Sequence, residues 1–292
     1  MTTHELPVIT STSNRRIVDA RKLRQRKYRD RTDSFLVEGL QIIYMAWEAG
    51  MMPVEVFYCE SLFRNRAAEE LMDRLRAGVS GGSDVDTALI PVSEEVLDSL
   101  ASRSASQGIV AVYKRHYTRL ESLSFTGGEL VVVLDRLRDP GNIGTLIRAA
   151  DAAGASAVIS LLPAAGAFDP KAVRSSMGSL FNVPIVVSES VGPVFASLHG
   201  AGLRSVAADP YEGVLWGRGL WEGGVGLVLG NEAQGLSEDV REQVQEWARL
   251  PLVGKAESLN VSIAGGVLMY AWLADNLDRI QPEKEGGGHE SL

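Results

Sequence analysis

The second half of the chain alternates short, continuous apolar runs with segments of helical pattern. The runs are ELVVVLD, SAVISLL, VPIVVSE, RSVAAD and VGLVLG, and their apolar residues do not alternate with polar ones. Strands that are apolar throughout are typical of a parallel sheet covered on both faces. The pattern therefore predicts an α/β domain with a parallel sheet over residues 129–280. Helices are expected at about 144–153, 171–180, 191–200 and 259–277.

The first half also alternates strands with helices, which predicts a smaller α/β domain over residues 1–115. Its expected strands include PVEVFYCE and IVAVYKR, and its expected helices include RNRAAEELMDRLRAG and SEEVLDSLA, the latter capped by Ser93. Residues 116–128 are expected to link the two domains. Residues 281–292 are polar and rich in glycine, which predicts a disordered tail.

Positive charge is concentrated near the start of the chain. The whole sequence has 29 Lys and Arg against 37 Asp and Glu, yet the segment 15–31 has nine basic residues against two acids. Its spacing predicts one helix, capped by Asn14, with Ile17, Ala20, Leu23 and Lys27 along one stripe. A solvated helix with internal ion pairs remains one interpretation. We favour a surface that follows nucleic-acid phosphates, with these candidate residues: Arg21, Lys22, Arg24, Arg26, Lys27 and Arg29.

Several protein classes are disfavoured by missing patterns. Cys59 is the single cysteine and the four histidines are scattered, so we expect neither an intrachain disulfide nor a metal site. The N-terminal residues lack a secretion signal and no apolar stretch is typical of a membrane span, so a soluble cytoplasmic protein is expected. The chain also lacks a dinucleotide-binding G-x-G-x-x-G after a strand, a P-loop and the G-x-S-x-G of hydrolases.

Three loops that follow expected strands are rich in glycine, asparagine and acids. They are LDRLRDPGNIGTLIRAADAAG, LVLGNEAQGL and LPLVGKAESLNVSIAGG. Ligands of open α/β sheets bind at the carboxyl ends of strands, so these loops are candidates for one site. Gly144 is expected to open a helix whose N-terminus could hold an anion, with Arg148 one turn further. Ser258 and Asn260 are equally compatible with simple capping of the last helix.

Together the three loops resemble the SpoU (TrmH-like) branch of the SPOUT RNA methyltransferases, whose three motifs they match in order and spacing. The resemblance covers 130–278, and KAVRSSMGSLFNVP is similar to the family segment between the first two motifs. More weakly, STSNRRIVDARKLRQRKYRDRTDSFLVEG resembles the start of the ribosomal-protein-like substrate-binding domain that precedes many of these catalytic domains.

The resemblance implies a homodimeric enzyme with a deep trefoil knot that transfers a methyl group from S-adenosylmethionine to a ribose 2′-oxygen of RNA. It places Gly230, Leu250 and Leu259 at the cofactor. It forms the catalytic cluster from these residues: Asn142, Arg148, Glu232, Ser258 and Asn260. The family proposal often makes the first-motif arginine the proton acceptor. Guanidinium scarcely deprotonates in proteins, so we favour Arg148 as the group that holds the substrate phosphate and 2′-hydroxyl.

The separate N-terminal domain favours 23S rRNA as the substrate, because relatives that act on tRNA commonly have short terminal extensions instead. A tRNA methyltransferase, a non-catalytic RNA-binding protein of ribosome assembly and a nucleotide-dependent oxidoreductase stay open as alternatives. Some two-domain relatives give resistance to avilamycin or thiostrepton, and the residues do not separate that role from a housekeeping one.

Overall fold

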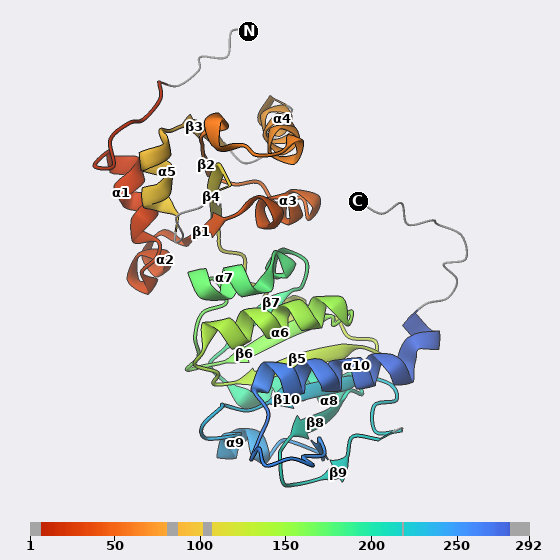
Figure 1. Cartoon of the computed structure of the whole chain (residues 1–292). Helices are drawn as coiled ribbons and strands as arrows, with labels where there is room; N and C mark the ends of the chain where they lie inside the picture. Colours follow the sequence, from red (N-terminus) through yellow and green to blue (C-terminus); the bar gives the residue numbers. More distant parts are fainter. Residues whose placement is uncertain (1–6, 81–86, 102–106, 218, 281–292) are drawn as a thin grey trace. The chain divides into compact units, whose positions relative to one another are not determined.

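The computed structural model describes residues 7–80, 87–101, 107–217 and 219–280 (Figure 1). The expected tail at 281–292 lies outside the described residues. Packing divides the chain into two compact units. Unit 1 consists of Met1–Tyr117, Asp139–Arg148 and Ala165–Asn182, and unit 2 consists of Thr118–Arg138, Ala149–Ala164 and Val183–Leu292.

Unit 1 contains a mixed sheet with the order β1-β4-β2-β3, formed by Ser34–Glu38, Ile109–Lys114, Glu55–Tyr58 and Ala88–Pro91. β4 pairs antiparallel with β1 and β2, and β3 pairs parallel with β2. α3 (Leu40–Glu48), α4 (Arg66–Ser80) and α5 (Glu94–Leu100) connect these strands, and the Ser93 side chain caps α5 as expected. One side of the sheet packs Phe57 and Val110 against Ile17, Leu23 and Leu97, among other buried residues.

The basic segment forms two helices, so the expectation of one continuous helix is wrong. α1 spans Arg15–Lys22 and α2 spans Arg26–Thr32. Between them the N–H groups of Leu23, Arg24 and Gln25 donate to carbonyls three residues earlier, which tightens the chain into turns and ends α1. The expected cap at Asn14 is confirmed, and Ile17, Ala20 and Leu23 are buried while Lys27 is exposed.

The remaining part of unit 1 includes α7 (Pro170–Ser176) and the short 3-10 helix η3 (Ser179–Phe181). Phe168 and Phe181 pack against the first sheet through Phe35, with ring centroids 4.6 Å and 6.1 Å away. The helix expected over 171–180 is shorter because Met177 takes a left-handed conformation, φ 52°, after α7. A Cβ at Gly178 would clash with the Met45 side chain, which fixes glycine there.

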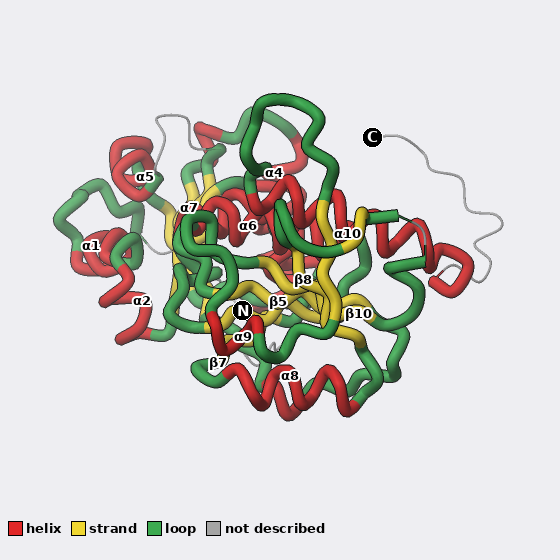
Figure 2. The backbone as a smooth tube through the Cα atoms, turned by 90° about the horizontal axis from the view of Figure 1, so that it is seen from below, coloured by secondary structure: helices red, strands yellow, loops and turns green. Residues whose placement is uncertain are grey.

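Unit 2 is built on the expected parallel sheet. Its order is β7-β6-β5-β10-β8-β11-β9, and every pairing between its described strands is parallel. The strands span these ranges: β5 Leu130–Asp135, β6 Ala157–Leu161, β7 Ile185–Ser188, β8 Arg204–Ala208, β9 Val214–Leu215, β10 Val225–Leu229 and β11 Glu246–Arg249. α8 (Val191–Gly200) and α10 (Val261–Ile280) lie on opposite faces of this sheet (Figure 2). α9 (Glu238–Arg241) follows β10, and η2 (Leu120–Ser122) precedes β5.

The helix after β5 begins earlier than expected. α6 spans Pro140–Ala152, so Gly144 lies inside the helix and does not open it. The Asp139 carboxylate accepts the N–H of Gly141 at 2.6 Å, and Pro140 suits the first helical position. Gly144 is required for packing, because a Cβ there would collide with the Ala172 carbonyl and the Ser175 hydroxyl of α7.

Candidate active site

Unit 2 contains a hollow of about 520 Å³ at the carboxyl ends of β8, β10 and β11. Its walls come from the loops that follow these strands and from the first turns of α10. Six of the eight expected site residues line it: Gly230, Glu232, Leu250, Ser258, Leu259 and Asn260. Two loops of the three are thus brought together, at the edge of the sheet where ligands of parallel sheets bind.

The loop after β10 is held by Asn231, which is buried. Its side-chain oxygen accepts the N–H groups of Ala233 and Gln234 at 2.9 Å and 3.2 Å, and its amide donates to the Arg136 carbonyl at 2.8 Å. The backbones of Asn231 and Gly235 also exchange two hydrogen bonds of 2.9 Å. Sequence reasoning missed Asn231 as a structural residue, although it stands between two residues that it selected.

Gly230 is required by this tight loop. A Cβ at Gly230 would lie 2.6 Å from the carbonyl carbon of Gly235 and 2.8 Å from the nitrogen of Leu236. Both atoms belong to backbone that the Asn231 hydrogen bonds fix, so neither yields easily. Glycine at this position therefore allows the Gly235–Leu236 backbone to approach closely beside the hollow, which Gly230 lines.

The loop before α10 brings polar and apolar groups to the same wall. Asn260 caps α10, since its side-chain oxygen accepts two hydrogen bonds from Ser262, one from the N–H at 2.9 Å and one from the hydroxyl at 2.6 Å. Ser258 and Leu259 are exposed, and Leu259 retains 41% of its accessible surface. The Tyr211 hydroxyl donates to the Glu257 carbonyl at 3.4 Å, which joins this loop to the one after β8. An exposed leucine beside a polar rim gives the hollow both an apolar and a polar wall.

Hydrogen bonds and an ion pair join the end of β5 to the residues that follow the β10 loop. Asp135, fully buried, accepts the Ser237 N–H at 2.6 Å and the Ser237 hydroxyl at 2.8 Å. One guanidinium nitrogen of Arg136 donates to both carboxylate oxygens of Asp239, at 3.0 Å and 2.8 Å. The hydrogen bond from Ser237, together with the Arg136 charge, holds the pKa of Asp239 below its ordinary value. These contacts fix the end of the loop that carries Gly230 and Glu232, because Ser237 and Asp239 follow it in the chain.

The first expected loop is organised separately. Asn142 and Arg148 belong to α6 and are not among the residues that line the hollow. Lys171 donates to both carboxylate oxygens of Asp139 at 3.0 Å, and this hydrogen bond, with the Gly141 N–H, lowers the pKa of Asp139. Arg148 is exposed on the helix. Its guanidinium therefore faces solvent in the single chain.

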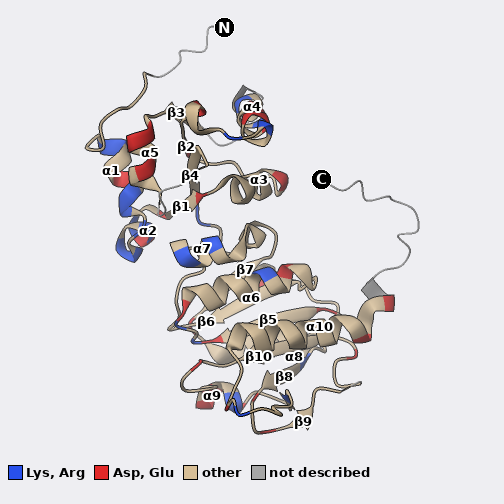
Figure 3. Ribbon diagram, in the orientation of Figure 1, with Lys and Arg blue, Asp and Glu red and all other residues tan. Residues whose placement is uncertain are grey.

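The candidate RNA-binding residues have different environments. Lys and Arg are concentrated on α1 and α2 (Figure 3). Arg29 is a correction to the sequence prediction: it is 5% exposed, and its guanidinium donates to the carbonyls of Leu23 and Arg24 and to Asp169 at 2.9 Å. Its guanidinium is therefore engaged inside the fold, whereas the sequence prediction required an exposed side chain. Arg24 donates to the Leu100 carbonyl at 2.7 Å, Arg21 and Lys22 are half-buried, and Arg26 and Lys27 are exposed.

Two further findings concern the described part of the chain. It contains no group of three His, Cys, Asp or Glu side chains that could hold a metal ion. Within the same residues, no helix is both long enough and apolar enough to cross a bilayer.

Comparison with protein families gives two matches that divide the chain. The SpoU rRNA Methylase family matches residues 129–270, and the MRM3-like substrate binding domain matches residues 14–111. Among curated proteins, the 23S rRNA (guanosine(2553)-2′-O)-methyltransferase RlmP of Bacillus subtilis is 29% identical over 264 residues, 90% of this chain and 97% of the relative. The 23S rRNA (uridine(2479)-2′-O)-methyltransferase of Streptomyces viridochromogenes is 32% identical over 261 residues, 85% of each chain.

Solved structures match over nearly the same length. The AdoMet-bound rRNA methyltransferase from Sinorhizobium meliloti is 31% identical, with a TM-score of 0.81 over 92% of this chain and 97% of that one. The SpoU methyltransferase AviRb from Streptomyces viridochromogenes, in complex with AdoMet, is 30% identical, with a TM-score of 0.79 over 90% of this chain and 98% of that one.

Proposed function

The chain belongs to the SpoU rRNA methylase family, and on that premise we propose that it methylates a ribose 2′-hydroxyl of 23S rRNA with S-adenosylmethionine as donor. The observation that carries the proposal is the hollow at the ends of β10 and β11, which unites six of the residues selected by the motif match. The named relatives act on 23S rRNA, which favours this substrate over tRNA. We place the protein in the cytoplasm, where it would meet that RNA.

The two family matches support a division of labour along the sequence. We assign RNA binding to residues 1–115 and catalysis to residues 129–280, joined by the linker 116–128. By family membership we also propose that the loops after β10 and β11 take part in a deep trefoil knot. The knot would keep the two loops together, since neither could withdraw without unthreading the chain.

The hollow suits S-adenosylmethionine. Its volume of about 520 Å³ lies within the usual range for small-molecule sites, roughly 300–1,000 Å³. Gly230 leaves backbone groups uncovered, while Leu250 and Leu259 offer apolar surface. We propose that these three residues hold the cofactor, which supplies a methyl group already activated on a sulfonium. The protein then has two tasks, to align the ribose oxygen and to remove its proton.

Alignment can contribute most of the acceleration, up to about 7–11 kcal/mol in favourable cases. We assign the substrate phosphate and 2′-hydroxyl to Arg148, which keeps its own proton and donates hydrogen bonds. In this arrangement the phosphate helps to take the hydroxyl proton. Asn142 orients the sugar, and Ser258 and Asn260 shape the pocket. Glu232 completes the cluster at the rim of the hollow.

We propose that two copies associate through the exposed apolar face of α10. Ile263, Val267, Tyr270 and Leu277 lie on that helix at coiled-coil-like spacing and are 36% to 57% exposed. A stripe of this kind on one long helix is self-complementary, as the interface of a twofold dimer must be. The second copy is therefore the occupant that suits this face.

Two variants separate binding from catalysis. Arg148→Ala should abolish methyl transfer to 23S rRNA yet leave S-adenosylmethionine affinity, measured by calorimetry, nearly unchanged. Gly230→Ala should weaken that affinity at least 10-fold, because the new Cβ meets fixed backbone. Gly254→Ala is the matched control, since nothing lies within 4 Å of a Cβ there. Unchanged turnover in Arg148→Ala would refute its role.

Two further measurements test the alternatives. Binding of S-adenosylmethionine but not NAD excludes the oxidoreductase, and binding without any transfer would favour the non-catalytic RNA-binding protein. RNA with a 2′-deoxy target residue should bind and yield no product. Ribose-methylation maps of rRNA from cells with and without the gene identify the nucleotide, and unchanged maps would refute the assignment to rRNA.

A further inference from the structure

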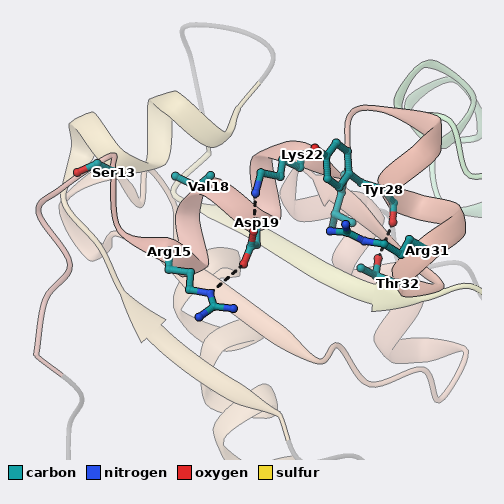
Figure 4. A pocket seen from close by; sticks show the side chains of 9 residues that line it. Ser13, Arg15, Val18, Asp19, Lys22, Tyr28, Arg31 and Thr32 are labelled. Carbon is teal, nitrogen blue, oxygen red and sulfur yellow. Dashed lines mark hydrogen bonds and ion pairs between the residues drawn. The ribbon is translucent and has the colours of Figure 1, made fainter.

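Unit 1 contains a further hollow, between α1 and α2, with a volume of about 550 Å³ (Figure 4). We call it the α1–α2 hollow. It is lined by Ser13, Arg15, Val18, Asp19, Lys22, Leu23, Tyr28, Arg31 and Thr32. Its size is within the usual range for small-molecule sites, and none of the sequence motifs accounts for it.

The break in the basic segment creates this hollow. α1 ends at Lys22, the chain turns through Leu23 and Gln25, and α2 begins at Arg26. As a result, Tyr28 and Arg31 of α2 stand near Lys22 of α1 (Figure 4). One continuous helix would have separated these side chains along its axis.

Two cations lie within reach of the Tyr28 ring. The Lys22 ammonium lies 5.5 Å from the ring centroid and the Arg31 guanidinium lies 4.9 Å from it. Both distances are within the range of a cation–π interaction. This combination suits an unpaired nucleotide, because its base stacks on aromatic rings or guanidinium planes while its phosphate contacts cations.

The charge of the hollow also favours an anion. Asp19 pairs with Lys22 at 2.9 Å and with Arg15 at 3.8 Å (Figure 4). The Lys22 hydrogen bond lowers the pKa of Asp19, which keeps this carboxylate ionised and holds Lys22 in place. Three cations nevertheless surround a single carboxylate in the lining. The Arg15 side chain is 96% exposed, so its guanidinium is open to a phosphate from solvent.

Other basic groups of the segment serve the fold instead. Arg29 is buried against Asp169, and Arg24 donates to the Leu100 carbonyl. The candidate RNA-binding residues that line the hollow therefore differ from those that the sequence predicted. Lys22 is common to both, whereas Arg15, Arg31 and Tyr28 are new.

We propose that the α1–α2 hollow binds one unpaired nucleotide of the RNA substrate. The base stacks on Tyr28. The phosphate lies among Arg15, Lys22 and Arg31. The inference rests on the proposed function and deepens it, since it places a recognition point for single-stranded RNA in the substrate-binding domain.

The test measures binding of the full-length protein to an unmodified 23S rRNA transcript over a series of KCl concentrations. Tyr28→Leu should lower the affinity about 10-fold without changing its salt dependence, and Tyr28→Phe should retain wild-type affinity. Arg31→Gln should reduce the slope of log affinity against log salt by about 0.7, the value for one phosphate contact to a single strand. A role in folding alone would not change that slope.

Arg74→Gln is the matched control. Arg74 also lies over a tyrosine ring, 5.2 Å from the centroid of Tyr44, and it pairs with Glu48 outside the hollow. It should change neither affinity nor slope. Thermal unfolding and S-adenosylmethionine affinity check that each variant is folded.

The outcomes distinguish the two proposals. If the wild type binds and methylates the transcript while Tyr28→Leu and Arg31→Gln keep its affinity and slope, the hollow does not hold a nucleotide. An equal loss in Arg74→Gln would likewise overturn the site, because the effect would then be general to surface charge. If the wild type neither binds nor methylates the transcript, the proposed function fails first.

Discussion

Replacing Asp169 with asparagine would remove the negative charge that faces the buried Arg29 guanidinium. The two groups are 2.9 Å apart, and their side chains are 30% and 6% exposed. Breaking a fully buried ion pair costs about 3–5 kcal/mol. Asp169 is partly exposed, and the carbonyls of Leu23 and Arg24 still accept hydrogen bonds from Arg29 in the variant. We therefore expect Asp169→Asn to lower the free energy of unfolding by about 2 kcal/mol.

A second substitution isolates another role of the same residue. Asp169 caps α7, where it accepts the Lys171 N–H at 3.0 Å. Asparagine can keep this bond and alanine cannot, so Asp169→Ala should cost about 1 kcal/mol more. The pair of variants therefore separates the ion pair from the cap.

Urea unfolding followed by circular dichroism measures both free energies. Glu70→Gln is the matched control: Glu70 pairs with Arg66 at the same distance, 2.9 Å, but the side chains are 55% and 87% exposed. It should cost less than about 0.5 kcal/mol. If Asp169→Asn costs no more than this control, the buried pair does not stabilise unit 1 and the reasoning is wrong.

Two further predictions concern pH and assembly. Asp139→Asn should lower the melting temperature at neutral pH, because it removes the charge that pairs with Lys171. The pKa of Asp139 is lowered from 3.8 in the folded protein, so the difference in melting temperature between wild type and variant should persist down to about pH 4 and vanish as the pH falls through the lowered pKa. A difference in melting temperature that stays constant as the pH falls below about 4 would contradict this. Ile263→Asp should convert the proposed dimer to monomer in sedimentation velocity, since it places a charge on the apolar face of α10; an unchanged sedimentation coefficient would exclude that face as the interface.

The parallel sheet was predictable because its strands are apolar on both faces. Four residues of these strands illustrate this, because all are fully buried: Val131, Val133, Ile159 and Val228. Their apolar side chains alone therefore predict that the strands lie in the core. Caps were predictable for a similar reason, as Asn14 and Ser93 bond N–H groups only two or three residues away. The motif match likewise selected Gly230 and Asn260, because each belongs to a motif whose residues are contiguous in the sequence.

Features that depend on distant partners were not predictable. Arg29 has the same sequence context as its exposed neighbours, and only the packed fold shows that Asp169 lies against it. Gly144 was expected to begin a helix, but glycine is needed there because α7 packs against it closely. No pattern in the neighbouring sequence predicts this contact. The break at Leu23 was missed because the apolar stripe continues through it, although the turn there creates the α1–α2 hollow.

The packing of α7 explains why contacts divide this chain differently from its sequence motifs. The ring centroid of Phe168, before α7, lies 4.6 Å from that of Phe35 and 4.9 Å from that of Tyr117. The ring centroid of Phe181, after α7, lies 5.2 Å from that of Tyr113. On its other side, α7 accepts the close approach of Gly144, and Lys171 pairs with Asp139 at the start of α6. The aromatic residues of the segment between the first two motifs thus pack against Phe35 and Tyr113 of the first sheet and against Tyr117 after it. Its polar residues pair both with the first motif, through Lys171, and with α2, through Asp169. A domain boundary drawn at residues 116–128 follows the order of the motifs, whereas the compact unit that contains Asn142 and α7 also contains Met1–Tyr117.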